Sequence, residues 1–367
     1  MKNFCFVSSS DPNGVTFALN ILLELGLRIE VSQDFSLWSE TREGFVFDPT
    51  HHLELPKWLP ALEPGRHFRF IPDKTVYWQH SYPFNYTGVS QNVVLFVRDP
   101  RDALYSSRRR NYPDLEFGDY LESADLEVCL TRVKAWQLFY RGWYDLGVAR
   151  VQRFEDLKFQ PLAEIRNLVK MMDVDFSDID IMSAVNLSTS EKAELGEKKF
   201  QALTNLQGRK VNFGGQPLEW KSDGMRKGIS QAILQTLQTE CEIFKYTDYS
   251  VGEEIVGTSL SQDFALPTFS NYLLMHRDLY SSEDFRIARY LKVFARHKGR
   301  TVEKLSGLLS YTLKSNTISS VILPMRERFI GKVLALFLRP SISILVKIQD
   351  WKKLLGRQIC NRVLGKC

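Results

Sequence analysis

An arginine and a serine eight residues apart have the types and spacing of a phosphate-binding pair. Arg98 directly follows the apolar run 93–97, and Ser106 lies two helical turns further along. Ligands of open α/β sheets bind at the carboxyl ends of the strands. A guanidinium at such a place can form a bidentate pair of hydrogen bonds with a phosphate, and a hydroxyl can donate a further hydrogen bond. The alternative is structural, a helix cap with a surface ion pair.

A turn-forming segment near the start offers a second anion site. Residues 8–17 hold Asp, Pro, Asn and Gly between a strand pattern and a helix pattern. Backbone N–H groups in a loop that leads into a helix form a cradle for anions, glycine lets the backbone approach closely, and threonine adds a hydroxyl. A plain turn between strand and helix would have a similar sequence. The candidate contacts are Asn13, Gly14, Val15, Thr16 and Phe17.

The segments that must position these residues alternate between strand and helix patterns. Short apolar runs predict strands over residues 4–8, 93–97 and 149–154. Helical spacing, with caps and stops, predicts helices over residues 15–25, 99–110, 127–146, 161–172 and 229–244. An uninterrupted β-branched run such as 93–97 is typical of a central parallel strand. The pattern therefore predicts an α/β fold with a central parallel sheet flanked by helices.

The stretch from Arg98 to Ser106, Arg-Asp-Pro-Arg-Asp-Ala-Leu-Tyr-Ser, resembles the 3′-phosphate-binding motif of sulfotransferases. These enzymes take a sulfuryl group from PAPS (3′-phosphoadenosine-5′-phosphosulfate). Further segments match that family in the same order over roughly residues 1–250. The resemblance implies a P-loop-NTPase-like sulfotransferase fold, PAPS as co-substrate, PAP as product and no metal. It also implies that Arg98 and Ser106 bind the 3′-phosphate, and that residues 8–17 form the 5′-phosphosulfate loop.

One position departs from the family pattern. The family usually has a basic residue two positions before the loop glycine, and this chain has Pro12 there. A lysine at that place counters the charge that develops on the leaving phosphate, and loss of one such donor typically costs ~10²–10³ in rate. Three outcomes stay open: another cation substitutes, turnover is slow, or the protein binds without catalysing.

His80 lies where the family places its catalytic histidine, near the end of a strand and before a proline-containing turn. A hydroxyl acceptor must lose a proton as it attacks sulfur, and a neutral imidazole can take that proton. The resemblance therefore implies that His80 is the general base. A structural histidine is the alternative. The other histidines of this region, His51, His52 and His67, have no partners at metal-ligand spacing and are expected to lie at the surface.

Two later segments complete the resemblance. Residues 153–157, Arg-Phe-Glu-Asp-Leu, resemble the family's Tyr-Glu-Asp-Leu segment, and their acids are expected to cap a helix or pair with arginine. Residues 208–221 resemble a late loop that closes over the nucleotide, although Val211 replaces its glycine and the spacing is longer. By this resemblance Arg209 and Lys210 reach the 3′-phosphate. Ordinary solvated loop charge is the alternative.

The composition sets limits on the function. The 367 residues carry 48 Lys and Arg against 43 Asp and Glu, a net charge of +5 that suits an anionic substrate and falls short of a dedicated nucleic-acid binder. Five scattered cysteines without a CxxC pair indicate neither a zinc site nor a disulfide framework, and fit a reducing compartment. The N-terminal apolar run is too short for a signal peptide, and no run has the roughly 18 apolar residues of a membrane span. We expect a cytoplasmic protein.

The composition changes near residue 250, which predicts a domain boundary there and a mainly helical, basic extension over residues 251–367. By the resemblance, residues 1–250 are the sulfotransferase domain. A helix is predicted over 272–313. Residues 314–367 hold eleven Lys and Arg against two acidic residues. Apolar and basic residues alternate at helical spacing over 329–338 and 342–355, as in helices that lie on membrane surfaces. Peripheral membrane contact and packing on the catalytic domain both remain open for this extension.

Three functional hypotheses follow. The first is sulfuryl transfer from PAPS to a hydroxyl or amine of a small-molecule, lipid or carbohydrate acceptor, whose pocket would draw on the aromatic-rich intervals 35–86 and 136–143. The second is a catalytically weak relative that binds the nucleotide or a sulfated ligand. The third is a nucleotide kinase or another P-loop NTPase, which the missing Gly-Lys-Ser/Thr disfavours. The sequence identifies neither the acceptor nor the oligomeric state.

Overall fold

The computed structural model of the chain describes most of the first 204 residues and several later segments: 3–50, 52, 55–63, 65–125, 128, 130–204, 229–246, 255–256 and 266–280. The chain divides into two compact units, residues 1–121 with 136–272 and residues 122–135 with 273–367. The predicted boundary at residue 250 stays a prediction.

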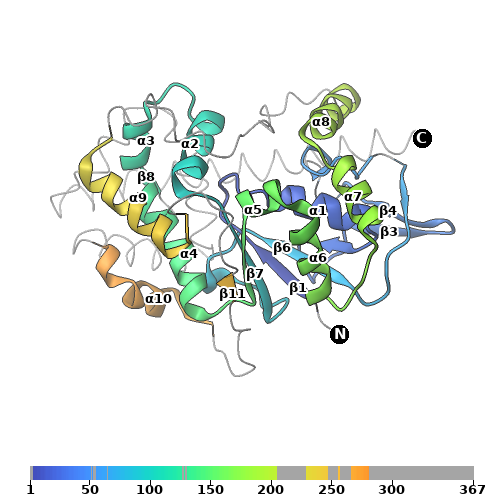
Figure 1. Ribbon diagram of the computed structural model, residues 1–367, viewed down its shortest axis with the longest axis horizontal. Coiled ribbons are helices and arrows are strands. Elements are labelled where there is room, and N and C mark those ends of the chain that lie inside the picture. Colours follow the sequence, from blue (N-terminus) through green and yellow to red (C-terminus); the bar gives the residue numbers. More distant parts are fainter. Residues whose placement is uncertain are drawn as a thin grey trace, which may run out of the picture. The chain divides into compact units, whose positions relative to one another are not determined.

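The first unit is built on one central sheet. Its strand order is β11-β10-β7-β1-β6-β2 (Figure 1). Five strands are parallel, and β11 joins β10 antiparallel at the edge. The strands are β1 (Phe4–Val7), β2 (Arg28–Glu30), β6 (Thr75–Gln79), β7 (Asn92–Val97), β10 (Arg150–Arg153) and β11 (Ile255–Val256).

The strand order fixes where a ligand can bind. β1 lies between β6 and β7 in the sheet. After β1 the chain forms β2 and β6 on one side of β1, and then β7 and β10 on the other side. This reversal is the switch point of an open α/β sheet, where a crevice opens at the carboxyl ends of the strands. The segments after β1 and after β7 meet there, and these are the two segments that the sequence selects.

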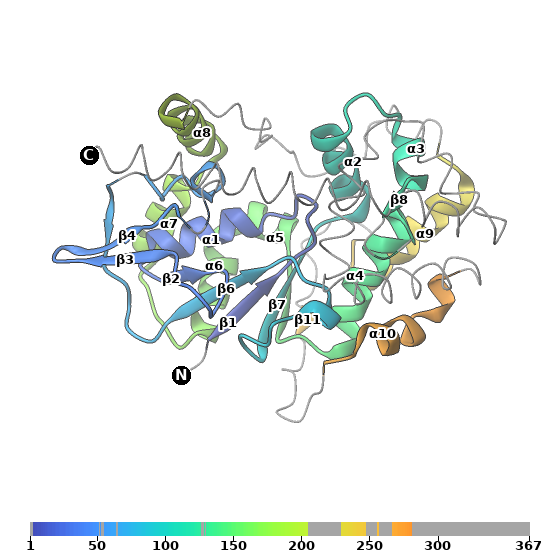
Figure 2. The ribbon, with the colours of Figure 1, turned by 180° about the vertical axis from the view of Figure 1, so that it is seen from behind.

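Helices flank the sheet. α1, α6 and α7 contribute to one core cluster together with β1, β6 and β7 (Figure 1; seen from behind in Figure 2). The helices are α1 (Val15–Glu24), α2 (Pro100–Asn111), α3 (Phe117–Glu122), α4 (Arg132–Leu146), α5 (Phe154–Phe159), α6 (Pro161–Met171), α7 (Asp178–Leu187), α8 (Ser190–Thr204), α9 (Gln231–Ile243) and α10 (Phe269–Met275), with 3-10 turns at Leu55–Lys57, Pro83–Asn85 and Arg277–Leu279. The predicted α/β class, a central parallel sheet flanked by helices, is confirmed.

A buried asparagine holds α1 in place. Asn20 donates to the Ser188 hydroxyl at 2.7 Å and accepts from the Ala61 amide at 2.9 Å. Its side chain is 1% exposed, so both hydrogen bonds replace water that the group has lost. α1 is therefore tied to the segment after α7 and to the loop after residue 57, which fixes the direction in which its N-terminus points.

Smaller sheets complete the two units. In the first unit, β3 (Trp38–Thr41), β4 (Gly44–Phe47) and β5 (His67–Phe68) form an antiparallel sheet. In the second unit, β8 (Ala124–Asp125) and β9 (Leu130–Thr131) pair antiparallel.

Two sequence predictions of helices differ from the structure. The helix expected over 127–146 begins at Arg132, because Leu130 and Thr131 pair with β8 as a strand instead. The helix expected from Tyr272 onward begins at Phe269 and ends at Met275, where a 3-10 turn follows. Residues 281–313 of that prediction lie outside the described residues.

Within the described segments no helix combines the length and apolar character that crossing a bilayer requires. The basic stretch 314–367 lies outside the described residues, so its membrane contact and its packing both stay predictions.

Candidate functional site

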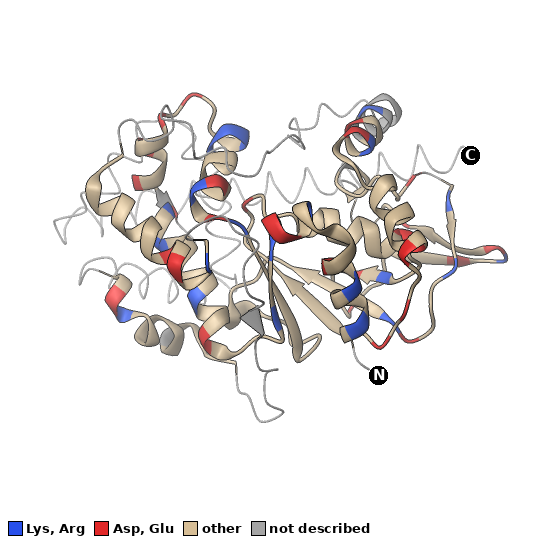
Figure 3. Cartoon of the chain, viewed as in Figure 1, with Lys and Arg blue, Asp and Glu red and all other residues tan. Residues whose placement is uncertain are grey.

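Arg98 and Ser106 form a direct pair. Arg98 follows the last residue of β7, and its Nη1 donates to the Ser106 hydroxyl oxygen at 3.0 Å. α2 begins in between because Asp99 caps it, its carboxylate accepting the Arg101 amide at 3.0 Å, and Pro100 takes the first helical position. The cap sets the helix so that residue 106 faces the strand end. Figure 3 shows basic positions at both ends of α2, with acidic ones beside those at its start.

The Arg98 guanidinium is buried as well as paired. Its side chain is 2% exposed, and its Nη2 lies 3.9 Å from the carboxylate of Asp102, at the outer limit of an ion pair. Asp102 itself is fully buried. A phosphate therefore reaches the guanidinium only if the side chains that cover it move aside.

The loop after β1 is held together by its own polar side chains. The Asn13 amide donates to the carbonyls of Ser9 and Asp11 at 3.0 and 2.7 Å, and its oxygen accepts the Val15 amide at 3.2 Å. The Ser9 hydroxyl in turn lies 3.0 Å from the Tyr140 hydroxyl. Asn13 is thus an internal brace of the loop, 2% exposed. Nothing in the sequence pattern distinguishes this bracing role from ligand contact.

Gly14 is the point where the loop turns into α1. It adopts the left-handed conformation, with φ +81°, and its carbonyl accepts the amides of Phe17 and Ala18. Because the ring of Phe154 would lie only 2.3 Å from a Cβ at this position, any other residue would both strain the backbone and collide. The helix N-terminus carries neither a capping side chain nor an acidic residue in its first turn. Such an end attracts anions.

The same Phe154 ring also faces Arg98. The guanidinium carbon lies 4.8 Å from the ring centroid. One aromatic ring, from the first residue of α5, therefore contacts both candidate phosphate-binding elements. The sequence marks Phe154 only as a replacement for the family's tyrosine, and its packing on Gly14 is a long-range contact that local patterns do not encode.

His80 directly follows β6 and faces the loop after β1. Its Nδ1 lies 2.9 Å from the Ser8 carbonyl and 3.1 Å from the Ser8 hydroxyl. Because a carbonyl oxygen only accepts, Nδ1 carries the proton, which leaves the lone pair on Nε2. His80 as a whole is exposed to solvent. Loss of water around the ring is the largest influence and lowers the pKa of His80. Hydrogen bonding to the backbone of Ser8 and Ser9 opposes this shift, and the charges of Arg110 and His52 add to it.

A tryptophan ring packs against His80, and a second tryptophan packs against the first. Trp78 meets the imidazole edge-on at 4.9 Å between centroids, and Trp58 meets Trp78 at 6.4 Å. Other aromatic residues of the interval 35–86 have structural roles. Trp38, for example, packs edge-on against the rings of Phe47, Phe68 and Phe70 around the small β3–β5 sheet.

The acids of the 153–157 segment pair with the chain itself. Asp156 binds Arg153 at 2.6 Å, and Glu155 accepts the Asp99 amide at 3.4 Å. Burial first and the Asp99 carboxylate second raise the pKa of Glu155, to about 8, while Arg98 opposes the rise. Asp156 thus pairs with arginine as the sequence predicts, whereas Glu155 binds the backbone amide of Asp99, and its altered ionisation is not foreseeable from sequence.

Two candidate ligands of the late loop, Arg209 and Lys210, lie outside the described residues, so their role stays a prediction. The others come together: the loop residues 13–17, Arg98 with Ser106, and His80 belong to the segments that follow β1, β7 and β6, which are neighbours in the sheet.

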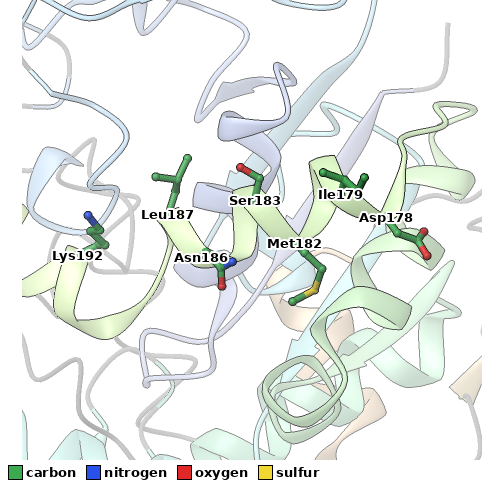
Figure 4. Close-up of a pocket in the computed structure, with 7 residues that line it drawn as sticks. All are labelled: Asp178, Ile179, Met182, Ser183, Asn186, Leu187 and Lys192. Atoms are coloured by element: carbon green, nitrogen blue, oxygen red, sulfur yellow. The ribbon is translucent and has the colours of Figure 1, made fainter.

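A surface pocket of about 730 Å³ lies elsewhere, on α7 and the start of α8 (Figure 4). None of the sequence-predicted site residues lines it. Its lining is formed by Asp178, Ile179, Met182, Ser183, Asn186, Leu187 and Lys192. Among the described residues no group of three or more His, Cys, Asp or Glu side chains is placed to hold a metal ion.

Comparison with known proteins gives a likeness to solved structures alone. No family model and no curated protein matches the chain. A solved structure, that of the mouse sulfotransferase SULT7A1 complexed with PAP, is similar at 15% identity, with 65% of this chain and 83% of that chain covered and a TM-score of 0.39. A likeness of this size does not say which residues of this chain bind a ligand.

The contact between Gly14 and Phe154 predicts an energetic coupling. Gly14→Ala should lower the free energy of unfolding, by ~1–2 kcal/mol for the left-handed backbone and by a further amount for the collision. In a Phe154→Leu background the collision part should shrink, which gives a coupling of at least about 1 kcal/mol. Urea unfolding of the two single variants and the double variant measures it. Gly88→Ala is the matched control, since Gly88 also has a positive φ (+71°) but no atom within 4 Å of the added Cβ. Strictly additive free energies would contradict the contact.

The raised pKa of Glu155 predicts how stability depends on pH. The folded chain keeps the proton on Glu155 up to about pH 8, whereas the unfolded carboxyl releases it near its ordinary pKa of 4.5. Between these values the folded state binds more protons, so the free energy of unfolding falls as the pH rises. Glu155→Gln cannot ionise and should be less affected by pH over this window. Urea unfolding at about pH 5 and about pH 8 tests this, with the exposed Glu194→Gln as control. Parallel pH curves for wild type and Glu155→Gln would show that Glu155 ionises normally.

Proposed function

We propose that the chain is a PAPS-dependent sulfotransferase that acts on a hydroxyl or amine of a small-molecule, lipid or carbohydrate acceptor. The observation that carries the proposal is the 3.0 Å hydrogen bond between Arg98 Nη1 and Ser106 Oγ at the end of β7. The pair lies at the sheet's switch point, beside a loop whose helix N-terminus has no capping side chain. Two anion-binding elements at one crevice suit a nucleotide with phosphates at both its 3′ and 5′ positions.

The donor groups fit the two ends of this nucleotide. Arg98 and Ser106 can bind the 3′-phosphate with a charged fork and a hydroxyl. Backbone amides at the start of α1, near Gly14, can bind the 5′ end, and the Thr16 hydroxyl can add to them. Phe154 contacts both elements and so fixes their separation. The 2% exposure of Arg98 requires its cover to open on binding. Arg209 and Lys210 belong to the proposal as further ligands of the 3′-phosphate.

His80 is the proposed general base. The bound donor supplies the sulfuryl group: the bond from sulfur to the 5′-phosphate oxygen breaks, its electron pair stays on that oxygen, and PAP leaves as sulfur bonds to the acceptor oxygen or nitrogen. His80 Nε2 receives the acceptor proton, because the Ser8 carbonyl holds the other proton on Nδ1. The lowered pKa keeps this imidazole neutral near pH 7.

The acceptor is expected to have an apolar or aromatic portion. Trp78 lies edge-on against the imidazole of His80, and Trp58 lies edge-on against Trp78. Such rings bury apolar surface and can stack on a planar acceptor.

Binding without transfer is the second candidate function. Pro12 favours it, because the loop residue that would counter charge on the leaving phosphate is missing.

Loss of the Arg98–Ser106 pair should remove the preference for a 3′-phosphate. The wild-type chain should bind PAP more tightly than AMP, which lacks that phosphate. Charge-assisted hydrogen bonds contribute ~1.5–3 kcal/mol, so Arg98→Lys/Ser106→Ala should weaken PAP binding by about 10- to 100-fold with little change for AMP. Isothermal titration calorimetry measures both affinities.

The AMP affinity reports whether this variant is folded, and Ser107→Ala, a buried neighbour on the same helix, is the matched control. Equal affinities of the wild-type chain for PAP and AMP would contradict the assignment of this pair.

Replacing the proposed base should separate chemistry from binding. His80→Asn can still donate to the Ser8 carbonyl but cannot take a proton, so kcat should fall by ~10²–10⁴ while PAP affinity stays unchanged. Because the pKa of His80 is lowered, wild-type kcat/KM should decline only as the pH drops below 6.5. Transfer from labelled PAPS to a broad acceptor panel provides the assay, with the exposed His67→Asn as control. A wild-type chain that binds PAP and transfers to no acceptor would favour the second candidate function.

A further inference from the structure

A lysine on α5 lies beside the first turn of α1. Lys158 Nζ is 5.0 Å from the centroid of the Phe17 ring. Phe17 is the third residue of α1 and follows Gly14 by three positions. Lys158 belongs to the last turn of α5 and follows Phe154 by four positions. The sequence resemblance gives no role to this lysine.

Two contacts set the register between these helices. The ring of Phe154 lies against Gly14, where both helices begin, and Lys158 lies over Phe17 about one turn further on. Side chains on a helix lean toward its N-terminus. The Lys158 stem therefore leans toward Phe154 and the loop glycine, and a flexible four-carbon stem lets the ammonium approach the loop without movement of the backbone.

Lys158 differs from the arginines of the same crevice. Arg101 binds Asp99 at 2.5 Å and Arg153 binds Asp156 at 2.6 Å. Arg98 is engaged with Ser106 and Asp102. Among the described residues no carboxylate lies within ion-pair distance of Lys158.

Glu191 affects the pKa of Lys158 but does not form an ion pair with it. Glu191 raises the pKa of Lys158, against a larger lowering by loss of water. The Glu191 carboxylate is fully exposed and accepts a hydrogen bond from Ser190 at the start of α8. Lys158 is exposed as a residue, so its ammonium on the aromatic face of Phe17 is free to gain a contact when an anion comes within reach.

We propose that Lys158 supplies the cation that the loop lacks at Pro12. Its ammonium binds the 5′-phosphosulfate end of the nucleotide at the N-terminus of α1. As the bond between sulfur and the 5′-phosphate oxygen breaks, the electron pair that this oxygen gains lies beside the Lys158 charge. The inference rests on the proposed function, and it answers the objection that Pro12 raises to catalysis.

The experiment compares two nucleotides that differ only at the 5′ end. PAP carries both phosphates, and adenosine 3′-monophosphate lacks the 5′ one. Lys158→Met removes the charge and keeps the stem, so it should weaken PAP binding about tenfold or more and leave the affinity for adenosine 3′-monophosphate unchanged. Lys158→Arg should restore most of the PAP affinity. Lys170→Met, in the last turn of the next helix, is the matched control.

The outcomes distinguish the two proposals. If the wild-type chain binds PAP and Lys158→Met binds it equally well, the role of Lys158 is wrong while the proposed function stands. If Lys158→Met weakens both nucleotides equally, the lysine acts on the fold rather than on the 5′ phosphate, and the role is again wrong. A wild-type chain without affinity for PAP overturns the proposed function, and the role of Lys158 with it.

Discussion

The contact of the Phe154 ring with both Gly14 and Arg98 is the constraint on which the candidate site depends. The ring fills the space where a Cβ on residue 14 would stand, and its face lies 4.8 Å from the Arg98 guanidinium. The attraction between an aromatic face and a cation contributes ~0.5–2 kcal/mol. The restriction that the ring places on the positions of the two neighbouring segments matters more. The loop after β1 and the strand end of β7 cannot move independently while one rigid ring separates them. The distance between the two candidate anion-binding elements is therefore set by a side chain from a third element, α5.

The buried acidic groups around this ring are either close to an arginine or neutral. Asp99 and Asp102 are fully buried, and each has an arginine beside it, at 2.5 Å for Asp99 and 3.9 Å for Asp102. An unpaired charge in such a place would cost several kcal/mol. Glu155 avoids that cost differently, because burial and Asp99 raise its pKa to about 8 and keep it protonated near neutral pH. An ionised Glu155 would compete with an incoming phosphate for Arg98. Under the proposed function, the neutral form would not compete with the phosphate for this guanidinium.

The sequence predicts those parts of the site that depend on local spacing. Asp99 and Pro100 specify where α2 begins, and the two-turn interval to Ser106 then brings the hydroxyl to Arg98. The continuous run before Arg98 correctly indicates a central strand. The Phe154–Gly14 and Lys158–Phe17 contacts join residues about 140 positions apart, and only the strand order brings them together. The same limit explains the wrong start of α4, since the pairing of Leu130 and Thr131 with β8 outweighs their helical pattern.

The absence of a basic residue from a sequence motif does not by itself mean that the folded site lacks a positive charge. Coulomb energy depends on the distance between the charge and the phosphate, and not on which segment of the chain carries the charge. In this fold α5 contacts the start of α1, through Phe154 on Gly14 and Lys158 over Phe17, so under the proposed role a side chain of α5 would supply the charge that the loop lacks. A lysine side chain that already lies on an aromatic ring has lost part of its conformational entropy. It would therefore lose less entropy on binding an anion than a lysine on a mobile loop. Proline at position 12 then has its own structural use, since it stiffens the turn that Asn13 braces.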